Sequence, residues 1–302
     1  MRLVTFRRTR NDDGHALLGA IPEGGQEVVE LSGAYLNAPR SMLDLVEGGA
    51  EALRVAALNL AHLPKRYALS EVRLLAPFPM PRRNIFCIGK NYREHVNEVS
   101  FIEPKEGEQP PRVDAPAHPV VFTKATTAVI GPDAAIPSWL DDTDSTDYEG
   151  ELAVVIGRGG RGIAAADAMD HVFGYTIVND VTARRLQKRH GQWFVGKSLD
   201  GFCPMGPCIV TADEIPDVSR LKVQTRVNHE LRQNGCVGDL IFDIPTLIET
   251  LSRGMTLLPG DIIATGTPAG VGMGFDPYRF LKPGDEVEIT IEPIGTLRNP
   301  VA

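Results

Sequence analysis

The feature that most restricts the fold is a long succession of short, strand-like runs with few helical patterns between them. Runs such as "RLVTF", "NIFCIG", "ELAVVIG" and "FGYTIVND" are rich in β-branched and aromatic residues and are bounded by turn residues. The clearest helical pattern is "FDIPTLIETLSRG", in which Asp243 can cap the first turn and apolar residues recur at helical spacing. A second, short helix is predicted near residues 164–171. Because the regular alternation of strands and helices of a Rossmann fold is missing, we predict an α+β or mostly β fold.

A proline-rich segment divides the chain into a short and a long part. The segment is "APFPMPRR", residues 76–83, and a chain of 302 residues is long enough for two domains. Ahead of it, Ser41 could cap a short helix, and "AEALRVAALNLAHL" favours a helix until Pro64. We therefore predict a small N-terminal α+β domain over residues 1–76 and a second domain over residues 77–302.

Composition excludes several classes of protein. The net charge of −8 argues against a nucleic-acid-binding surface, and the basic residues within 184–189 are predicted to form a solvated helix face or a subunit contact. No apolar stretch approaches the ~18 residues of a membrane span, and "MRLVTFRRTR" has no signal-peptide pattern. The four cysteines include no CxxC pair, which is typical of a reducing compartment. We expect a cytoplasmic protein without a membrane or nucleic-acid partner.

Two acids, Glu149 and Glu151, stand two residues apart at the start of a strongly apolar run. Residues i and i+2 of a strand point to the same face, so the two carboxylates would lie side by side and repel each other. Asp180 ends the strand-like run "YTIVND", where an aspartate has no packing role. Three carboxylates suit Mg²⁺ or Mn²⁺. From spacing alone, a metal site and a set of solvent-exposed acids both remain open.

A second candidate site lies in "CIGKNYREHVNEV". His95 and Glu98 are three residues apart and share a face of a helical turn. A carboxylate that holds an imidazole in one tautomer makes a general base able to activate water. Lys197, flanked by apolar and glycine residues in "FVGKSLDG", is a candidate for stabilising a developing oxyanion. From the pattern alone, a lone histidine beside a surface glutamate and a solvated lysine are the commoner alternatives, and both remain open.

A polar, charged and proline-rich connection occupies residues 99–119. Connections of this length without structure of their own are usually functional or disordered. Because His95 and Glu98 stand at its near end, we predict that residues 94–118 form a lid that becomes ordered when a 2-oxo acid binds.

Six segments, in order, resemble the fumarylacetoacetate hydrolase family. They are "IGKNYREHVNE", "DYEGELAVVIG", "GYTIVNDVTAR", "VGKSLDGFCPMGP", "PGDIIATGTPAGVG" and "PGDEVEITIEPIGTLRNPV". The resemblance runs from about residue 72 to the end, and the residues before it look like the small N-terminal domain of some members. It implies the family fold, an α+β, layered and rolled mixed β-structure with few helices, usually assembled as a homodimer.

The resemblance implies a metal site. Glu149, Glu151 and Asp180 correspond to the family's ligands of Mg²⁺ or Mn²⁺. A divalent cation between them would explain why two neighbouring acids are tolerated.

The resemblance also implies the catalytic and substrate-binding residues. His95 and Glu98 correspond to the family's water-activating dyad, and Lys197 to its active-site lysine. Gln187 and Thr267 correspond to positions that contact the carboxylate and oxo groups of the substrate.

Two departures from the founding hydrolase point away from fumarylacetoacetate as the substrate. Where that enzyme has a fourth metal-binding aspartate, upstream of its histidine, this chain has the apolar strand "FCIG". Where it has an aromatic substrate contact after the glutamine, this chain reads "KRHGQWF". The chain is more similar to the branch of acylpyruvate hydrolases, oxaloacetate decarboxylases, and isomerases or decarboxylases of aromatic-acid breakdown.

That branch shares enolate chemistry on 2-oxo acids, in which a divalent cation acts as a Lewis acid. The reaction expected first is hydrolysis of a C–C bond in an acylpyruvate-type 2,4-dioxo acid, with the dyad activating the water and Lys197 offsetting the charge on the C4 oxygen. The alternatives are decarboxylation of an oxaloacetate-type acid and isomerisation of a 2-hydroxyhepta-2,4-diene-1,7-dioate. A metal-dependent binding protein without catalysis is a further alternative, against which the dyad and the lysine argue.

Overall fold

A computed structural model describes residues 1–10, 14–22, 24–99 and 115–302 of the chain. Most of its secondary structure is in strands: β1 Arg2–Arg8, β2 Leu17–Ile21, β3 Glu27–Glu30, β4 Arg66–Ala68, β5 Val72–Leu75, β6 Ile85–Gly89, β7 Val120–Lys124, β8 Val129–Ile130, β9 Thr146–Asp147, β10 Gly150–Ile156, β11 Val172–Asn179, β12 Thr182–Ala183, β13 Cys203–Thr211, β14 Lys222–Val227, β15 Glu230–Cys236, β16 Ile262–Ala264, β17 Glu286–Ile291 and β18 Gly295–Pro300.

The helices of the described residues are short. They are α1 Met42–Glu47, α2 Gly49–Asn59, α3 Arg93–Val99, α4 Arg184–Arg189, α5 Phe194–Lys197 and α6 Ile244–Ser252, with further single turns of 3₁₀-helix. None of these helices is both long and apolar enough to cross a bilayer. The predicted α+β class, with many strands and few helices, is confirmed.

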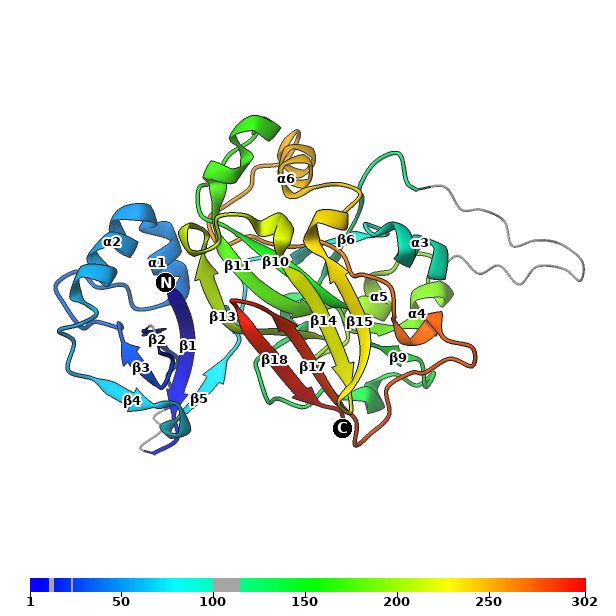
Figure 1. Ribbon diagram of the computed structural model, residues 1–302, viewed down its shortest axis with the longest axis horizontal. Coiled ribbons are helices and arrows are strands. Elements are labelled where there is room, and N and C mark those ends of the chain that lie inside the picture. The colour runs from blue at the N-terminus through cyan, green and yellow to red at the C-terminus, as the bar shows by residue number, and fades with distance from the viewer. Residues whose placement is uncertain (11–13, 23, 100–114) are drawn as a thin grey trace, which may run out of the picture.

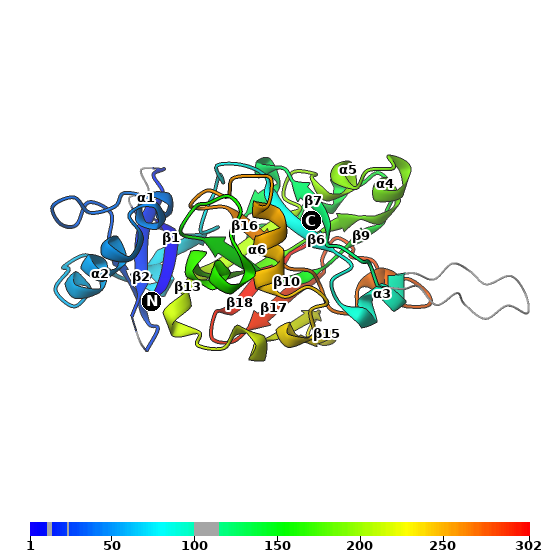
Figure 2. The same ribbon diagram turned by 90° about the horizontal axis from the view of Figure 1, so that it is seen from above.

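The described strands form one large mixed sheet, a smaller four-stranded sheet packed on it, and the two-stranded pair of β9 with β12. In the described residues the large sheet follows the order β4-β3-β2-β1-β13-β11-β10-β16-β6-β7. The smaller sheet, in the order β15-β14-β17-β18, packs through β14, β17 and β18 against β10, β11 and β13 (Figure 1). The N-terminal strands and helices lie at one end of the molecule and α3 lies towards the other (Figures 1 and 2).

The N-terminal strands join the rest of the molecule through β1. This strand pairs with β13, with Arg2 opposite Val210 and Leu3 opposite Ile209. The predicted cap of α1 is confirmed, because the Ser41 hydroxyl accepts a hydrogen bond from the Asp44 N–H at 3.1 Å. The following helix, α2, ends at Asn59 and is therefore shorter than predicted.

Strand β10 lies inside the large sheet, between β11 and β16. Its run Leu152–Ile156 is apolar and buried throughout, because β11 and β16 flank its edges and neighbouring layers cover its faces. Strand β16 in turn pairs in parallel with β6. The strand that begins at the paired acids is therefore completely buried.

Two helix predictions differ in their outcome. Helix α6 forms as predicted, and Asp243 accepts a hydrogen bond from the Thr246 N–H at 2.9 Å. The segment predicted as a helix near 164–171 is instead a 3₁₀-helix, Ala165–His171, which packs on α6.

Candidate active site

The start of β10 lies beside the end of β11, because the two strands are antiparallel with Gly150 opposite Asn179. This register brings Asp180 next to Glu149, and the Asp180 N–H donates to the Glu149 carbonyl at 2.8 Å. Glu149, Glu151 and Asp180 are all buried, and each offers a carboxylate oxygen within 4.8 Å of the others. The structure therefore brings the three predicted acids together, and the alternative of solvent-exposed acids is wrong.

Two buried lysines approach these acids from different elements. Lys197, at the end of α5, donates from Nζ to Glu149 and to Asp180, both at 2.7 Å. Lys124, at the end of β7, donates to the other oxygen of Asp180 at 2.7 Å and to the Val181 carbonyl at 2.9 Å. Both lysines are almost completely buried, so the alternative of a solvated Lys197 is wrong.

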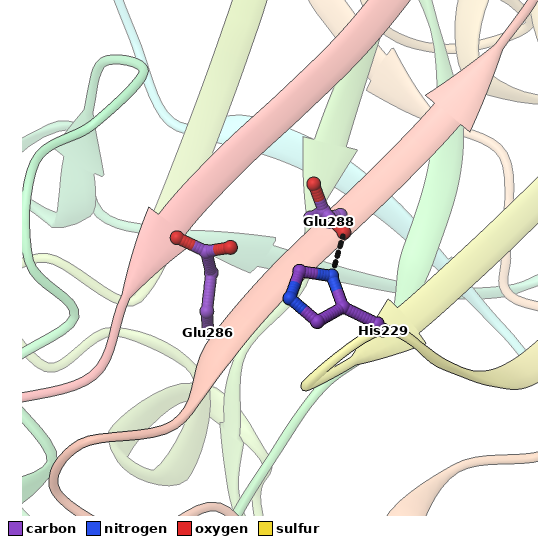
Figure 3. A group of neighbouring side chains, drawn as sticks. All are labelled: His229, Glu286 and Glu288. Carbon is purple, nitrogen blue, oxygen red and sulfur yellow. Dashed lines mark ion pairs between the residues drawn. The ribbon is translucent and has the colours of Figure 1, made fainter.

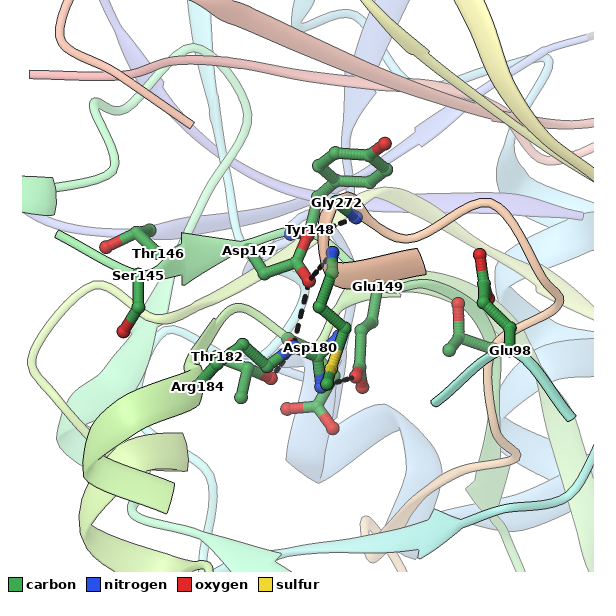
Figure 4. A network of polar contacts seen from close by, with 12 residues as sticks. Glu98, Ser145, Thr146, Asp147, Tyr148, Glu149, Asp180, Thr182, Arg184 and Gly272 are labelled. Atoms are coloured by element: carbon green, nitrogen blue, oxygen red, sulfur yellow. Dashed lines mark hydrogen bonds and ion pairs between the residues drawn. The ribbon is translucent and has the colours of Figure 1, made fainter. Parts of the chain in front are cut away.

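Arg184 is the third buried cation and lies between two acids (Figure 4). Its Nε donates to Asp147 at 2.8 Å, and its Nη1 forms an ion pair with Glu149 at 2.5 Å. The prediction of a solvated helix face is therefore wrong for Arg184, although the other basic residues of that run are exposed. The reason is local: β12 pairs with β9, with Thr182 opposite Asp147, so the first residue of α4 starts beside the acids.

Burial and neighbouring charges act in opposite directions on these groups. Burial alone would raise the pKa of Glu149, but the Arg184 guanidinium and the Lys197 ammonium hold that pKa well below its usual range. Burial would lower the pKa of Lys197, but the Asp180 and Glu149 carboxylates outweigh it and raise that pKa. Glu149 and Lys197 are therefore both charged at neutral pH.

Glu151 is in a different situation. Burial, together with the negative charges of Asp180 and Glu149, raises the pKa of Glu151 well above its usual range. Its Oε2 accepts a hydrogen bond from the Gly266 N–H at 2.8 Å, but within the described part of the chain no cation forms an ion pair with it. A buried carboxylate without a counter-charge is unfavourable unless it is protonated or binds a cation.

This donor set fits a hard divalent cation. Oxygen ligands of an octahedral Mg²⁺ lie about 2.1 Å from the ion and hence roughly 3–4 Å from one another. The carboxylate oxygens of Glu149, Glu151 and Asp180 lie within 4.8 Å of one another, so small side-chain movements suffice to bind such an ion. An ion held there would be the positively charged partner that Glu151 lacks. Glu149 and Asp180 would then contact both the ion and Lys197.

The candidate dyad lies on α3. His95 is buried, and its Nδ1 is 3.3 Å from Oε2 of Glu98. The other carboxylate oxygen of Glu98 accepts a hydrogen bond from the Gly270 N–H at 2.8 Å. The alternative of a surface His–Glu pair is therefore wrong, because the imidazole is enclosed and its partner is fixed by a second contact.

One cavity connects these groups. Its volume is about 230 Å³, and Ile88 of the apolar strand β6 forms part of its wall. Six of the eight residues singled out from the sequence line it, namely His95, Glu149, Glu151, Gln187, Lys197 and Thr267. The Thr267 hydroxyl already has protein partners, since it donates to the Gly150 carbonyl at 2.9 Å and accepts from Gln233 Nε2 at 2.7 Å.

Sequence reasoning missed three ionic residues of the site: Lys124, Asp147 and Arg184. Lys124 had a usable signal, because a lysine that directly ends the run "VVFTK" resembles the placement of Asp180 at the end of "YTIVND". Asp147 and Arg184 had no such signal, because each is placed by the pairing of β9 with β12, which contain only two residues each.

The predicted lid, residues 94–118, lies mainly outside the described residues. Its first part is helix α3, which carries His95 and Glu98. The lid itself stays a prediction.

A second group of three possible metal ligands occurs in the described residues, where the turn between β14 and β15 lies beside the start of β17 (Figure 3). It consists of His229, Glu286 and Glu288, with His229 Nδ1 3.5 Å from Glu288. The His229 side chain is 83% exposed, so solvent can stabilise these charges and no cation is required.

Comparison with known proteins agrees with this geometry. The family model described as "Fumarylacetoacetate (FAA) hydrolase C-terminal" matches residues 84–302. The chain belongs to the fumarylacetoacetate hydrolase family. The predicted resemblance is thus confirmed, and the protein is an enzyme of this superfamily.

The related proteins include differently named enzymes of the fumarylacetoacetate hydrolase family. Oxaloacetate tautomerase YisK of Bacillus subtilis (strain 168) is 58% identical over 235 residues, which are 78% of this chain and 75% of the relative. A solved fumarylacetoacetate hydrolase from the psychrophilic Exiguobacterium antarcticum is 42% identical, with a TM-score of 0.80 over 100% of this chain and 99% of that chain.

A third relative of this family was solved with ligands. It is the maleylpyruvate hydrolase of Sphingobium sp. SYK-6, in complex with manganese(II) ion and pyruvate. This structure is 33% identical, with a TM-score of 0.77 over 100% of this chain and 99% of that chain. These similarities confirm the predicted family fold.

Proposed function

We propose that the protein catalyses keto–enol proton transfer on a 2-oxo dicarboxylic acid of the oxaloacetate type, with Mg²⁺ or Mn²⁺ as its cofactor. The observation that carries the proposal is the cavity that brings carboxylates able to hold a cation together with a buried histidine and a buried lysine. The tautomerase name of the 58% identical relative supports this choice of reaction. The manganese of the maleylpyruvate hydrolase structure supports the choice of cofactor.

Each group of the cavity has a place in this reaction. Glu149, Glu151 and Asp180 would hold the cation, whose Lewis acidity makes the substrate's C3 protons more acidic when it is bound. His95 would move the proton at C3, because its Nδ1 faces Glu98 and its Nε2 is then the nitrogen left for the substrate.

Two buried cations of the cavity, Lys197 and Arg184, are suited to the oxygens of the substrate. Lys197 can offset negative charge that develops on the 2-oxo oxygen. Arg184 lines the same cavity, and its buried Nη2 has no hydrogen-bond partner in the described residues. A buried donor of this kind is unfavourable until a ligand satisfies it, so it is suited to bind a substrate carboxylate.

A second candidate reaction is hydrolysis of the C–C bond of an acylpyruvate-type 2,4-dioxo acid. The observation that favours it is the His95–Glu98 pair, because a base oriented by a carboxylate can activate water for attack on the C4 carbonyl. The similarity to a maleylpyruvate hydrolase supports it as well. Decarboxylation and isomerisation of 2-hydroxy-dienoates use the same groups and stay alternatives.

Product analysis separates these reactions. The purified protein would be assayed with enol oxaloacetate, acylpyruvates and 2-hydroxy-dienoates, each with Mg²⁺, with Mn²⁺ and with a chelator. We expect fast enol-to-keto conversion of oxaloacetate without loss of atoms. Release of pyruvate and a second acid from an acylpyruvate, without tautomerase activity, would establish the hydrolase instead. Release of CO₂ from oxaloacetate as the main reaction would establish the decarboxylase.

Replacing His95 by alanine is expected to reduce turnover by about 10²–10⁴-fold, the usual contribution of a general base. Metal and 2-oxo acid binding should persist, because the imidazole is not among the expected ligands. Steady-state kinetics and Mn²⁺-dependent binding of oxalate measure the two effects. Asn97→Ala, on the exposed side of the same helix, is the matched control. Wild-type turnover of His95→Ala would show that another group moves the proton.

Lys90 is placed to recognise a second carboxylate of the substrate. It lines the cavity directly after β6, and its φ of 57° is unfavourable for a lysine, as is common at functional sites. It forms no ion pair with any described residue. Its ammonium therefore remains available to an anionic ligand.

Replacing Lys90 by methionine is expected to lower kcat/KM for a dicarboxylic 2-oxo acid by about tenfold, the effect of one lost charge-assisted hydrogen bond at a partly solvated site. Binding of pyruvate, which has no second carboxylate, should change little. The comparison of oxaloacetate kinetics with pyruvate inhibition measures this difference. Lys222→Met, at an exposed position of strand β14, is the control for loss of charge. An equal effect on both ligands would contradict the assignment.

A further inference from the structure

One glycine-rich segment, "GTPAGVGMG" at residues 266–274, contacts three separate carboxylates of the candidate site. Its backbone N–H groups donate from Gly266 to Glu151 at 2.8 Å, from Gly270 to Glu98 at 2.8 Å, and from Gly272 to Asp147 at 2.6 Å. The segment thus connects an expected metal ligand, the dyad and the partner of Arg184. A change in this segment can therefore act on the chemistry without touching the substrate.

The glycines of the segment are needed for different reasons. Gly266 and Gly270 have φ values of 110° and 105°, a backbone conformation that side chains disfavour. Gly274 does not have a positive φ, so its backbone conformation is open to other residues. What Gly274 provides is space.

That space is filled by Glu98. A Cβ atom added at Gly274 would lie 1.8 Å from Oε1, 2.1 Å from Cδ and 2.3 Å from Cγ of Glu98. These are the three nearest atoms, so the end of one flexible side chain is what a larger residue would displace first. Alanine at this position is therefore expected to leave the backbone in place and to move Glu98.

The position of Glu98 sets the orientation of His95. Oε1 of Glu98 is held by the Gly270 N–H, and Oε2 lies 3.3 Å from Nδ1 of His95. A carboxylate cannot donate a hydrogen bond, so this contact places the proton of a neutral imidazole on Nδ1 and leaves Nε2 as the basic nitrogen.

We propose that Gly274 is a positioning residue for the dyad. Its missing side chain lets Glu98 dock on the glycine-rich segment, and the docked carboxylate holds the His95 proton on Nδ1. The effect on turnover rests on the proposed function, whereas the position of the ring proton does not.

The first test compares Gly274→Ala with Gly254→Ala. An added Cβ at Gly254 meets no atom within 4 Å, and that residue also lacks a positive φ, so it controls for the substitution itself. We expect kcat of Gly274→Ala to fall at least about tenfold, below the full ~10²–10⁴-fold of a lost base. KM and Mn²⁺ affinity should stay as in the wild type. Wild-type kcat, or a loss of Mn²⁺ affinity comparable to the loss of kcat, would overturn the proposal.

The second test is a double-mutant cycle with Glu98→Ala. If Gly274 acts through Glu98, adding Gly274→Ala to Glu98→Ala should change kcat by less than about twofold. If Gly274→Ala lowered kcat by the same factor in the wild type and in the Glu98→Ala protein, alanine at position 274 would act independently of Glu98. That result would overturn the proposal.

The third test does not depend on turnover. The ¹⁵N shifts of the His95 ring report which nitrogen carries the proton, with His95→Gln identifying the signal. In the wild type and in Gly254→Ala we expect the Nδ1–H tautomer, and in Gly274→Ala a mixture with Nε2–H. The same tautomer in all three proteins would overturn the proposal. If no 2-oxo acid is turned over by the wild type, the proposed function fails, and this measurement still decides the role of Gly274.

Discussion

Glu151→Gln is expected to abolish metal-dependent turnover of 2-oxo acids while leaving the metal-free protein at least as stable as the wild type. The amide has the shape of the carboxyl group but is a poor ligand for a hard cation. Loss of the Lewis acid removes several kcal/mol of stabilisation, so the rate should fall at least about 10³-fold. Kinetics at saturating Mn²⁺, together with Mn²⁺ titration, measure this effect.

The stability part of this prediction follows from the pKa of Glu151. That pKa is raised well above its ordinary value of 4.5 by burial and by Asp180 and Glu149. At a pH below the ordinary glutamate pKa, Glu151 is protonated in the folded and in the unfolded protein. The wild type and the Gln variant should then have similar stability. As the pH rises above it, the unfolded chain loses the proton first, so the wild type loses stability relative to the variant.

Thermal unfolding with a chelator at about pH 5 and about pH 8 tests the predicted direction of this pH dependence. The variant should gain stability relative to the wild type at the higher pH, and Mn²⁺ should stabilise only the wild type. A variant that is less stable than the wild type at both pH values would show that ionised Glu151 has a counter-charge in the metal-free protein.

Glu149→Gln is expected to abolish metal-dependent turnover as well, but with the opposite effect on stability. Glu149 is paired with Lys197 and Arg184, which are both buried. When the charge of Glu149 is removed, Lys197 keeps only Asp180 as an ion-pair partner among the described residues, and Arg184 keeps only Asp147. Breaking a buried ion pair on one side costs about 3–5 kcal/mol, and we expect the lower end because each cation keeps one partner.

Denaturant unfolding of the metal-free variants measures this contrast. The two glutamates lie two residues apart and undergo the same chemical change, so each variant is the matched control of the other. Equal stability of Glu149→Gln and Glu151→Gln would contradict the distribution of charges described for the site.

The fold was largely accessible from the sequence because its signals are local. The runs that became β1, β6, β10 and β11 are apolar and β-branched, and Ser41 and Asp243 have the side chains that cap helices. The sheet order was not accessible, because pairs such as β1 with β13 join residues about 200 positions apart. The 3₁₀ form of Ala165–His171 also depends on its packing on α6.

The candidate site could be predicted from the sequence only in part, because some of its contacts join segments that are far apart in the chain. Glu149 and Glu151 are close in sequence, so the period of a strand predicts their common face. Pairing of Glu149 with Arg184, in contrast, depends on a contact between distant segments. Charged residues in a sequence are usually solvated, and nothing local distinguishes Arg184 from its exposed neighbours.

The pairing of β1 with β13 has a consequence for shortened versions of the protein. Strand β1 covers the edge of β13 at Ile209 and Val210, which are both apolar. The other partners of β13 are β11 and β8. A fragment that begins after residue 76 would retain every residue of the candidate site but would expose this part of β13 as an apolar edge. Exposed edges of this kind recruit strands from other molecules, so such a fragment should be prone to aggregation even where its catalytic groups are correctly assembled.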